Sequence, residues 1–359
     1  MRPLPFFALC LGVHAAACVW LRRGARRAMD APVPPPSPET PVSVVIAAKN
    51  EAGRMAGTMA ALDAQTHGRL EIVVVDDGST DATPDLLTAW AARNPHVFLA
   101  GNNGTPGKKG ALVAGVAAAR HDALALTDAD CAPPPGWAAD LAARLAATEP
   151  PTVVVGYAPY RRRSGLLNAV ARYETLATGW LTAAAIGHGR PYMAVGRSLA
   201  YPRGVFEAVE AFAGHAHLLS GDDDLFVQAV HRARAARVVH AFGPDTLVPS
   251  NAPSSWRAWV RQKNRHLSDG RHYPASVQAA LAVFHGSGHA LWLAPLASGW
   301  TGAALLAARL GVQVWAMRPF ARAVGEADLV AKAPALELAF ALYQTLLAPL
   351  ASLRTLRRW

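Results

Sequence analysis

Between residues 42 and 131 the sequence alternates short apolar runs with longer helix-like stretches. The runs that we predict to be strands are Val42–Ala47, Leu70–Val75, Val97–Ala100 and Leu124–Thr127. The stretches that we predict to be helices are residues 50–64, 83–93 and 111–119. Apolar strands that alternate with helices are typical of a parallel sheet with helices on its faces. The sequence therefore predicts an α/β fold of the doubly wound, nucleotide-binding kind.

Two carboxylates follow the last of these strands directly. Asp128 and Asp130 are separated by one small residue, and in an extended chain residues i and i+2 point to the same side. Ligand sites in open α/β sheets lie at the carboxyl ends of strands, and hard cations such as Mg²⁺ or Mn²⁺ prefer oxygen ligands. We therefore expect Asp130, assisted by Asp128, to bind Mg²⁺ or Mn²⁺. A solvated turn is the commoner setting for an isolated Asp-x-Asp pair.

Loops after the earlier strands carry polar groups that suit a nucleotide. Asp76 and Asp77 end the second strand, where a carboxylate can accept a hydrogen bond from a nucleobase or a ribose hydroxyl; an Asx turn that caps the next helix is the alternative. Gly107, Lys108 and Lys109 precede a helix, and a helix N-terminus with lysines suits a diphosphate, although any one such lysine is more often simply solvated. The loop lacks the P-loop pattern, and the absence of Gly-x-Gly-x-x-Gly argues against a Rossmann dehydrogenase.

The composition is shifted toward that of a membrane protein, with 52% hydrophobic and 17% charged residues. A formal net charge of +10 suits an anionic membrane surface, a phosphate-bearing substrate or nucleic acid. No segment resembles a nucleic-acid-binding module, so we expect no nucleic-acid partner. The three cysteines, Cys10, Cys18 and Cys131, form neither a disulfide framework nor a zinc spacing. We therefore expect the catalytic part to lie in the cytosol.

Residues 1–28 are predicted to be a transmembrane anchor. Pro3–Leu21 is almost uncharged and long enough for a spanning helix, which needs ~17–25 residues. Four arginines within residues 22–27 follow at once, and the positive-inside rule keeps that end in the cytoplasm. A cleaved signal peptide is the alternative, with Ala15–Ala17 as its cleavage site. A signal peptide carries its charge before the apolar run, however, and here only Arg2 does so.

The C-terminal residues 273–359 contain further apolar segments that are typical of membrane helices. Ala275–Ser298 and Gly299–Met317 are each long enough to span a membrane, although Arg309 interrupts the second and requires a partner for its charge. Lys332–Leu353 is a third candidate and is followed by three arginines. Three full spans would place these arginines outside, against the positive-inside rule. The topology is therefore open: either the last segment is interfacial or re-entrant, or one of the others does not cross.

Four motifs between residues 42 and 131 resemble those of glycosyltransferase family 2, whose catalytic domain has the GT-A fold. Val44-Val-Ile-Ala-Ala-Lys-Asn-Glu51 is similar to the opening strand and Asn-Glu turn, with lysine where tyrosine is common. Val73-Val-Val-Asp-Asp-Gly-Ser-Thr-Asp81 is similar to the strand end that contacts uridine. The Gly-Lys-x-x-Ala-Leu-x-x-Gly segment begins at Gly107, and Asp128-Ala-Asp130 matches the metal motif. Jointly these motifs, in the family's order, imply a GT-A domain over residues 42–272, after a proline-rich linker at 29–41.

The second half carries three more similarities. Gly196-Arg-Ser-Leu-Ala-Tyr201 resembles the acceptor-side strand, and Ser220-Gly-Asp-Asp-Asp-Leu225 resembles the segment of the catalytic base, with glycine in place of a glutamate. That alignment implies that Asp222 is the catalytic base, with Asp223 as the main alternative for this role. Asp224 is then the expected N-cap of the following helix. Arg261-Gln-Lys-Asn-Arg-His266 resembles the Gln-x-x-Arg-Trp motif, with histidine in place of tryptophan. Arg265 is then expected to stabilise the leaving diphosphate.

The resemblance also implies the donor and its binding residues. A nucleotide-diphosphate sugar, with UDP as the expected nucleotide, would be the donor substrate. Its expected contacts are Asn50, Glu51, Asp76, Asp77, Lys108, Asp128 and Gln262. The metal, Mg²⁺ or Mn²⁺, would be held by Asp130 and Asp128.

We therefore expect an inverting glycosyltransferase, anchored in the cytoplasmic membrane with its catalytic domain in the cytosol. The membrane segments and the positive net charge favour a membrane lipid or a lipid-linked molecule as the acceptor. Two alternatives stay open: a processive polysaccharide synthase, against which His266 argues, and a non-catalytic scaffold that binds a nucleotide sugar. The sequence names neither the sugar nor the acceptor nor the oligomeric state.

Overall fold

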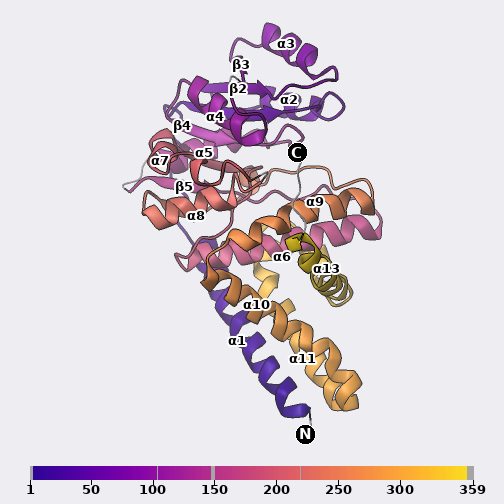
Figure 1. The fold of residues 1–359 in the computed structure, drawn as a ribbon. Helices are drawn as coiled ribbons and strands as arrows, with labels where there is room; N and C mark the ends of the chain where they lie inside the picture. Colours follow the sequence, from indigo (N-terminus) through magenta and orange to yellow (C-terminus); the bar gives the residue numbers. More distant parts are fainter. Residues whose placement is uncertain (1–2, 103, 147–149, 219, 354–359) are drawn as a thin grey trace. The chain divides into compact units, whose positions relative to one another are not determined.

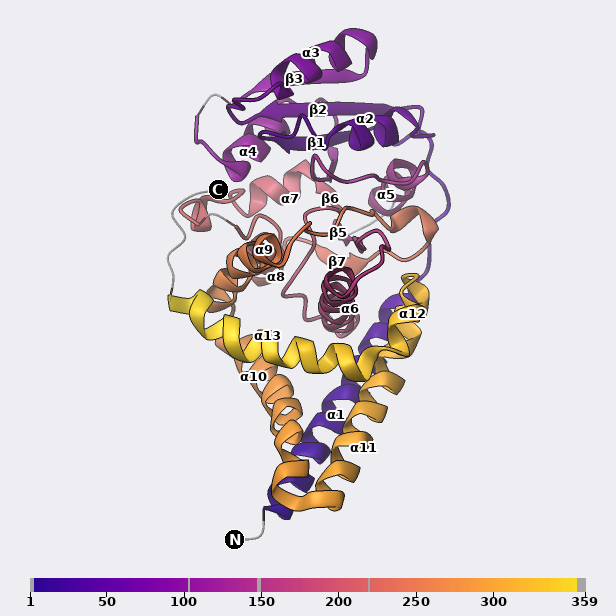
Figure 2. The same cartoon turned by 90° about the vertical axis from the view of Figure 1, so that its right-hand side faces the viewer.

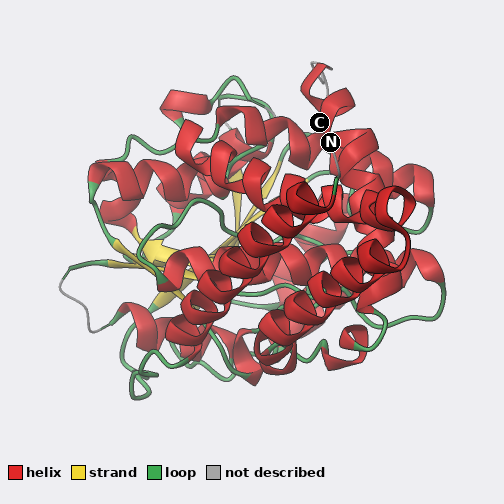
Figure 3. Ribbon diagram, turned by 90° about the horizontal axis from the view of Figure 1, so that it is seen from below, coloured by secondary structure: helices red, strands yellow, loops and turns green. Residues whose placement is uncertain are grey.

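The computed structural model describes residues 3–102, 104–146, 150–218 and 220–353. These residues form two compact units. The first, which we call the sheet unit, comprises residues 31–161 and 189–251, and the second, the helical unit, comprises residues 3–30, 162–188 and 252–353. Every named strand belongs to the sheet unit. Figure 3 draws the strands in yellow. The chain therefore leaves the sheet unit after residue 161 and returns to it at residue 189, with a helix of the helical unit in between.

A seven-stranded mixed sheet forms the centre of the sheet unit (Figure 1). The strands are β1 (Val42–Ala48), β2 (Leu70–Asp76), β3 (Val97–Gly101), β4 (Ala123–Leu126), β5 (Thr152–Val155), β6 (Leu199–Pro202) and β7 (Arg237–His240). Their order is β3-β2-β1-β4-β6-β5-β7, and only β6 runs antiparallel to its neighbours, β4 and β5. The predicted α/β fold with a mostly parallel sheet is therefore confirmed.

The helices of the sheet unit are α2 (Ala56–Asp63), α3 (Thr83–Arg93), α4 (Lys108–Ala118), α5 (Trp137–Leu145), α7 (Arg203–Ala208) and α8 (Asp224–Ala233). Strand β1 is buried along its whole length, as its apolar sequence requires. Ile46 of β1, Trp90 of α3 and Trp137 of α5 are buried in one apolar core. Because β1 pairs in parallel with both β2 and β4, the loops that follow these strands meet at one edge of the sheet.

The predicted helix over residues 50–64 is wrong at its N-terminal end, because α2 begins only at Ala56. Asn50 has a left-handed backbone, with φ of 56°. Its N–H donates to Ser79 Oγ at 2.8 Å, and the Glu51 N–H donates to Thr83 Oγ1 at 2.8 Å. These amides bond to the loop after β2 instead of beginning a helix, so residues 50–55 form a turn at the edge of the sheet.

The helical unit consists of α1 (Leu4–Met29), α6 (Leu166–Gly187), α9 (Trp256–Asp269), α10 (Ala275–Ala290), α11 (Ala294–Ala323), α12 (Ala327–Val330) and α13 (Ala333–Leu353). Helix α1 lies against α6, α10 and α11 (Figure 2). At its crossing with α6, a Cβ on Gly187 would lie 1.9 Å from the carbonyl oxygen of Gly24. The two helices therefore approach each other through glycines.

By length and composition, two helical segments of the described chain, Leu4–Met29 and Ala275–Ala323, could cross a membrane. The second contains both C-terminal spans that we predict first, and Gly299 interrupts its helical backbone. The third predicted span forms α13, which is not one of these two segments. The arginines that follow it, Arg354, Arg357 and Arg358, lie outside the described residues.

Buried polar groups hold the helical unit together. Arg309 of α11, whose charge the sequence leaves without a partner, lies 2.5 Å from Glu337 of α13. The Tyr173 hydroxyl of α6 donates to the other oxygen of Glu337 at 2.7 Å. His14 of α1 lies 3.2 Å from Gln313 Oε1 of α11. Polar contacts therefore connect α1, α6, α11 and α13 inside an otherwise apolar bundle, where unpaired charges would be costly.

Candidate active site at the edge of the sheet

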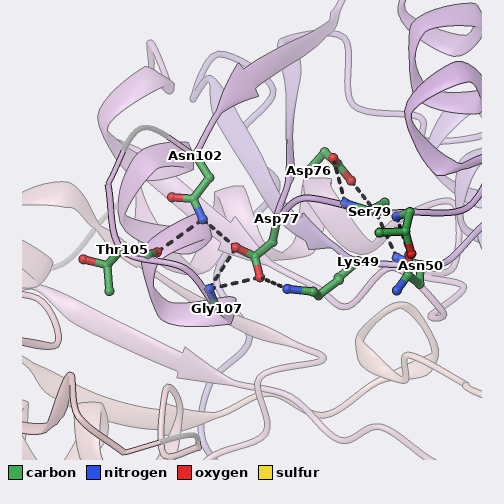
Figure 4. A network of polar contacts seen from close by, with 9 residues as sticks. Lys49, Asn50, Asp76, Asp77, Ser79, Asn102, Thr105 and Gly107 are labelled. Carbon is green, nitrogen blue, oxygen red and sulfur yellow. Dashed lines mark hydrogen bonds and ion pairs between the residues drawn. The ribbon is translucent and has the colours of Figure 1, made fainter. Parts of the chain in front are cut away.

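Asp77, at the end of β2, connects the strand ends to the glycine- and lysine-rich loop (Figure 4). Its carboxylate accepts hydrogen bonds from the Gly107 N–H at 2.8 and 3.0 Å and from the Asn102 amide at 2.6 Å. Lys49 Nζ lies 3.0 Å from the same carboxylate, whose side chain is only 2% exposed. Asp77 therefore holds the loop that leads into α4. This structural role is additional to the contact with the donor that is predicted for Asp77.

Asp76 and Asn50 organise the neighbouring turn. The carboxylate of Asp76 accepts from the Ser79 N–H at 3.1 Å and from the Ser79 hydroxyl at 2.5 Å. The Asn50 side-chain oxygen accepts from the Thr80 N–H at 2.8 Å, so the loops after β1 and β2 are joined (Figure 4). The predicted alternative, an Asx turn that caps the next helix, is wrong: the bond from the Ser79 N–H spans three residues, and the N-cap of α3, Ala82, has no side-chain hydrogen bond. The contact of Asp76 with a donor stays a prediction.

Lys108, the first residue of α4, lies between two of the predicted site carboxylates. Its Nζ is 2.9 Å from Asp128 Oδ1 and 2.7 Å from Asp222 Oδ2. Burial alone would lower the pKa of Lys108, but the charges of Asp128, Asp222 and Asp223 outweigh it, and the pKa is raised. The side chain is therefore a permanent cation that joins the Asp-x-Asp motif to the predicted base.

Asp128, Asp130 and Cys131 form a cluster at the end of β4 that has the size of a cation site. One potential ligand atom from each lies within 4.8 Å of the other two. Burial, followed by the charge of Asp128, raises the pKa of Asp130, and such mutual repulsion is what a bound cation would relieve. Burial also raises the pKa of the Cys131 thiol well above its usual range, which keeps it protonated. The available charged ligands are thus oxygens, as Mg²⁺ and Mn²⁺ prefer.

Glu51 belongs to the same electrostatic cluster. Burial raises its pKa to about 7, Arg54 opposes this effect, and the charges of Asp130 and Asp128 add to it. Arg54 donates to the Glu51 carboxylate at 2.9 Å. The turn after β1 therefore contributes the carboxyl group of Glu51, whose pKa depends on the charges of Asp128 and Asp130.

The three successive aspartates at the start of α8 have different partners. Asp223 is the N-cap, because its Oδ1 accepts from the Asp224 N–H at 2.8 Å, and its Oδ2 accepts from the Gly196 N–H at 2.9 Å. Asp224 accepts from the Ala194 N–H at 2.9 Å, so the prediction that Asp224 is the cap was wrong. Burial, with the charge of Asp222, raises the pKa of Asp223 to about 6. Asp222, which is 8% exposed, faces Lys108.

Arg197 is a neighbour of the site that the sequence reasoning missed. Its guanidinium lies 5.0 Å from the centroid of the Tyr160 ring and donates to Ser250 Oγ at 2.5 Å. Its charge lowers the pKa of Asp130, against the effect of burial. Arg197 is part of the Gly196–Tyr201 motif, but the resemblance assigned it no role. Lys109, predicted with Lys108 to suit a diphosphate, instead donates to the backbone carbonyl oxygens of His215 and Leu218.

Gln262 and Arg265 lie on α9, in the helical unit. Trp259 and Lys263 of the same helix are buried, and Lys263 forms an ion pair with Glu174 of α6. The sheet unit by itself therefore brings together Asn50, Glu51, Asp76, Asp77, Lys108, Asp128, Asp130, Asp222 and Asp223. The roles predicted for Gln262 and Arg265 stay predictions.

Comparison with known proteins bears on the family and the fold of the chain. Residues 43–207 match the model of the family described as "Glycosyl transferase family 2". An uncharacterized glycosyltransferase from Nostoc is 38% identical over 89 residues, which are 25% of this chain and 28% of that protein. The probable glycosyltransferase YdaM from Bacillus subtilis is 26% identical over 231 residues, which are 62% of this chain and 54% of that protein. The matches thus span about half the length of these relatives or less.

A solved structure shows the same fold. The mannosyltransferase PcManGT from Pyrobaculum calidifontis, in complex with GDP-Man and Mn²⁺, superimposes with a TM-score of 0.59 at 22% identity, over 94% of this chain and 99% of that chain. This likeness confirms the predicted GT-A fold. The family model covers the motifs from the first strand to Tyr201, so residues 43–207 form a domain of glycosyltransferase family 2.

Proposed function

We propose that the chain is a metal-dependent inverting glycosyltransferase that acts at a membrane. It would transfer a sugar from a nucleoside diphosphate to a hydroxyl group of a lipid or a lipid-linked acceptor. The observation that carries this proposal is the position of Lys108 Nζ, 2.9 Å from Asp128 and 2.7 Å from Asp222. The residues expected on the donor side and the residue expected to activate the acceptor thus share one charged cluster.

Asp222 is the proposed general base. In an inverting transfer the base removes the proton from the acceptor hydroxyl as its oxygen attacks the anomeric carbon, and the diphosphate leaves from the opposite face. Both oxygens of Asp223 accept backbone hydrogen bonds, from Asp224 and Gly196. This favours Asp222 over Asp223, because these two bonds hold the Asp223 carboxylate in place as the cap of α8.

The donor side would bind a nucleoside diphosphate sugar together with a divalent cation. Asp130 and Asp128 are the residues that would hold the cation, and their oxygen ligands fit Mg²⁺ or Mn²⁺. A cation bound there would neutralise charge that develops on the departing diphosphate. The archaeal mannosyltransferase was solved with Mn²⁺ and GDP-Man, whereas the sequence motifs favour UDP. Both nucleotides therefore belong in the test.

The membrane location rests on the helical unit. Leu4–Met29 and Ala275–Ala323 are long and apolar enough to span a bilayer, and Trp300 of α11 is 92% exposed. Arg22 of α1 donates to the Trp315 carbonyl at 2.6 Å and lies 4.3 Å from the centroid of the Trp315 ring. Such Trp–Arg pairs suit the boundary between lipid and water. A catalytic domain on the cytosolic side follows from the positive-inside rule.

A panel of nucleotide sugars tests this proposal. Membranes that contain the full chain are supplied with radiolabelled UDP- and GDP-linked sugars in the presence of Mn²⁺, Mg²⁺ or EDTA. We expect one donor to turn over, EDTA to abolish turnover, and label to enter the lipid fraction. Asp130→Ala should lose turnover, while Asp85→Asn, which changes an exposed acid on α3, should retain it.

Other outcomes separate the alternatives. Label in a polymer that is insoluble in organic solvent would identify a processive synthase instead. Donor binding without turnover under any condition would leave a nucleotide-sugar-binding scaffold. Turnover that is indifferent to both EDTA and Asp130→Ala would contradict the metal site.

A further inference from the structure

Adjacent lysines at the start of α4 reach in different directions. Lys108 contacts the carboxylates of Asp128 and Asp222. Lys109 is buried, with 8% exposure, and its Nζ donates to the backbone carbonyl oxygens of His215 at 2.7 Å and Leu218 at 3.1 Å. A buried ammonium is costly unless its donors are satisfied, so the contact between Lys109 and residues 215–218 is a fixed part of the fold.

The segment that Lys109 holds does not simply pack against α4. A groove of about 920 Å³ runs between them, lined on one side by Val113, Ala114 and Ala117 of α4 and on the other by Phe212, Ala216 and Leu218. Lys109 also lines the groove, and it donates to the backbone of this segment. The position of residues 213–218 relative to α4 therefore depends strongly on this one ammonium group.

His215 continues the connection toward Asp222. His215 is 8% exposed. Burial, followed by the charge of Lys109, lowers the pKa of its ring to about 4, against a hydrogen bond with the backbone of Gly221 that raises it, so a ring N–H donates and the Gly221 carbonyl oxygen accepts. Nε2 of His215 has no hydrogen-bond partner among the described residues, which leaves Nδ1 as the donor. Gly221 has φ of 86°, and Asp222 follows it directly.

These contacts form a closed ring of interactions. From Lys109 it passes through the His215 backbone and ring to Gly221, then through Asp222 to Lys108, the neighbour of Lys109 on α4. We propose that Lys109 and His215 are positioning residues, which hold Asp222 at the distance from α4 that the reaction requires. This inference rests on the proposed function of Asp222 as the base. Neither residue would touch the substrate.

The proposal predicts a loss of transfer that exceeds the loss of donor binding. Displacement of a catalytic group by about 1 Å can cost on the order of 100-fold in rate. We expect Lys109→Met to lower kcat for transfer about 10- to 100-fold and to leave the KM for the donor within about twofold of the wild-type value. Donor hydrolysis should fall less than transfer, because water can reorient to follow a displaced base and a bound acceptor hydroxyl cannot.

Two further variants separate positioning from general damage. Lys109→Arg keeps the charge and the donors and should recover most of the transfer rate, whereas His215→Phe keeps the ring shape and should resemble Lys109→Met. The matched control is Lys332→Met, which changes an exposed lysine in the helical unit. Hydrogen–deuterium exchange adds a readout independent of activity: in Lys109→Met the amides of residues 213–218 should exchange faster, while those of β1 should not.

The proposal is overturned if Lys109→Met transfers like the wild type, if transfer, hydrolysis and donor affinity fall together, or if exchange at residues 213–218 is unchanged. If the wild-type chain turns over no donor, the proposed function fails. The exchange experiment would still decide whether Lys109 holds the segment.

Discussion

Lys108 Nζ lies 2.7 Å from Asp222 Oδ2, although the two residues come from different halves of the sheet unit. Lys108 begins α4, next to the strands expected to bind the donor, and Asp222 precedes α8. Gly196 lies beside the pair: a Cβ there would lie 3.3 Å from Asp222 Oδ2 and 3.4 Å from Lys108 Nζ. The ion pair thus connects the groups proposed to bind the donor with the group proposed to activate the acceptor.

Replacement of Lys108 by methionine should abolish most of the transfer activity. The substitution leaves Asp128 and Asp222 without their shared cation and removes a positive charge expected to face the diphosphate. We expect kcat/KM to fall on the order of 100- to 1000-fold, the usual cost of removing one electrostatic group from an active site. Steady-state kinetics with the preferred donor measure this, with Lys332→Met as the control. A loss below threefold would contradict the role of Lys108.

Asp77→Ala should weaken donor binding and lower stability together. The Gly107 N–H, the Asn102 amide and Lys49 would lose their common acceptor. We expect the free energy of unfolding to fall by about 3 kcal/mol, because a buried hydrogen-bonded carboxylate is removed from its donors. Thermal unfolding and calorimetric titration of the donor measure the two effects. Unchanged donor affinity in a destabilised variant would show that the loop does not bind the donor.

Gly187→Ala tests the crossing of α1 and α6. The added methyl group would lie 1.9 Å from the Gly24 carbonyl oxygen, so the helices must separate. We expect a destabilisation of about 3 kcal/mol, at the upper end for overpacking, measured as a lower Tm in detergent. The control is Gly12→Ala on α1, where no atom lies within 4 Å of the new Cβ. That control should be neutral or slightly stabilising, since alanine favours helices.

His240 should make the stability of the sheet unit depend on pH. Burial lowers the pKa of this ring to about 4, and the charge of Arg144 lowers it further, against the effect of a backbone carbonyl. Above pH 6.5 the ring is neutral in both states and contributes no pH dependence. Between pH 6.5 and 4 the unfolded chain binds the proton first, so stability falls as pH falls. We expect a loss of about 2 kcal/mol between pH 7 and pH 5 from this residue.

The effect of His240 is isolated by comparison with His240→Phe. Stability measured against urea from pH 7 to pH 5 should fall more steeply in the wild type than in the variant. His231→Asn, which changes an exposed ring on α8, should follow the wild-type curve. Parallel curves for the wild type and His240→Phe would show that the ring protonates as easily in the fold as in the unfolded chain.

The central strands could be predicted because their sequences are continuous apolar runs with polar ends. β1, β2 and β3 begin where predicted, at Val42, Leu70 and Val97. The turn after β1 could not be predicted in the same way. Its amides bond to Ser79 and Thr83, and these tertiary contacts override the local preference for helix.

Contacts in the candidate site that a local motif implies could be predicted from the sequence. Contacts that depend on the backbone of a distant segment could not. Three successive aspartates look alike in sequence. The N–H groups of Gly196 and Ala194, from another segment, select the partners of Asp223 and Asp224. Arg197 and Lys109 likewise gain their importance from contacts with Ser250 and with residues 215–218. No local pattern carries such long-range pairings.

The most direct test of the account is a comparison of donor binding and transfer in Asp222→Asn. The amide keeps the size of the side chain and its contact distance to Lys108 but cannot accept the acceptor's proton at neutral pH. We predict donor affinity within about threefold of the wild type and a transfer rate lowered at least about 100-fold, in the range of general-base removal. Asp223→Asn should retain more transfer than Asp222→Asn. Transfer by Asp222→Asn near the wild-type rate would contradict the assignment of the base and, with it, the proposed arrangement of the site.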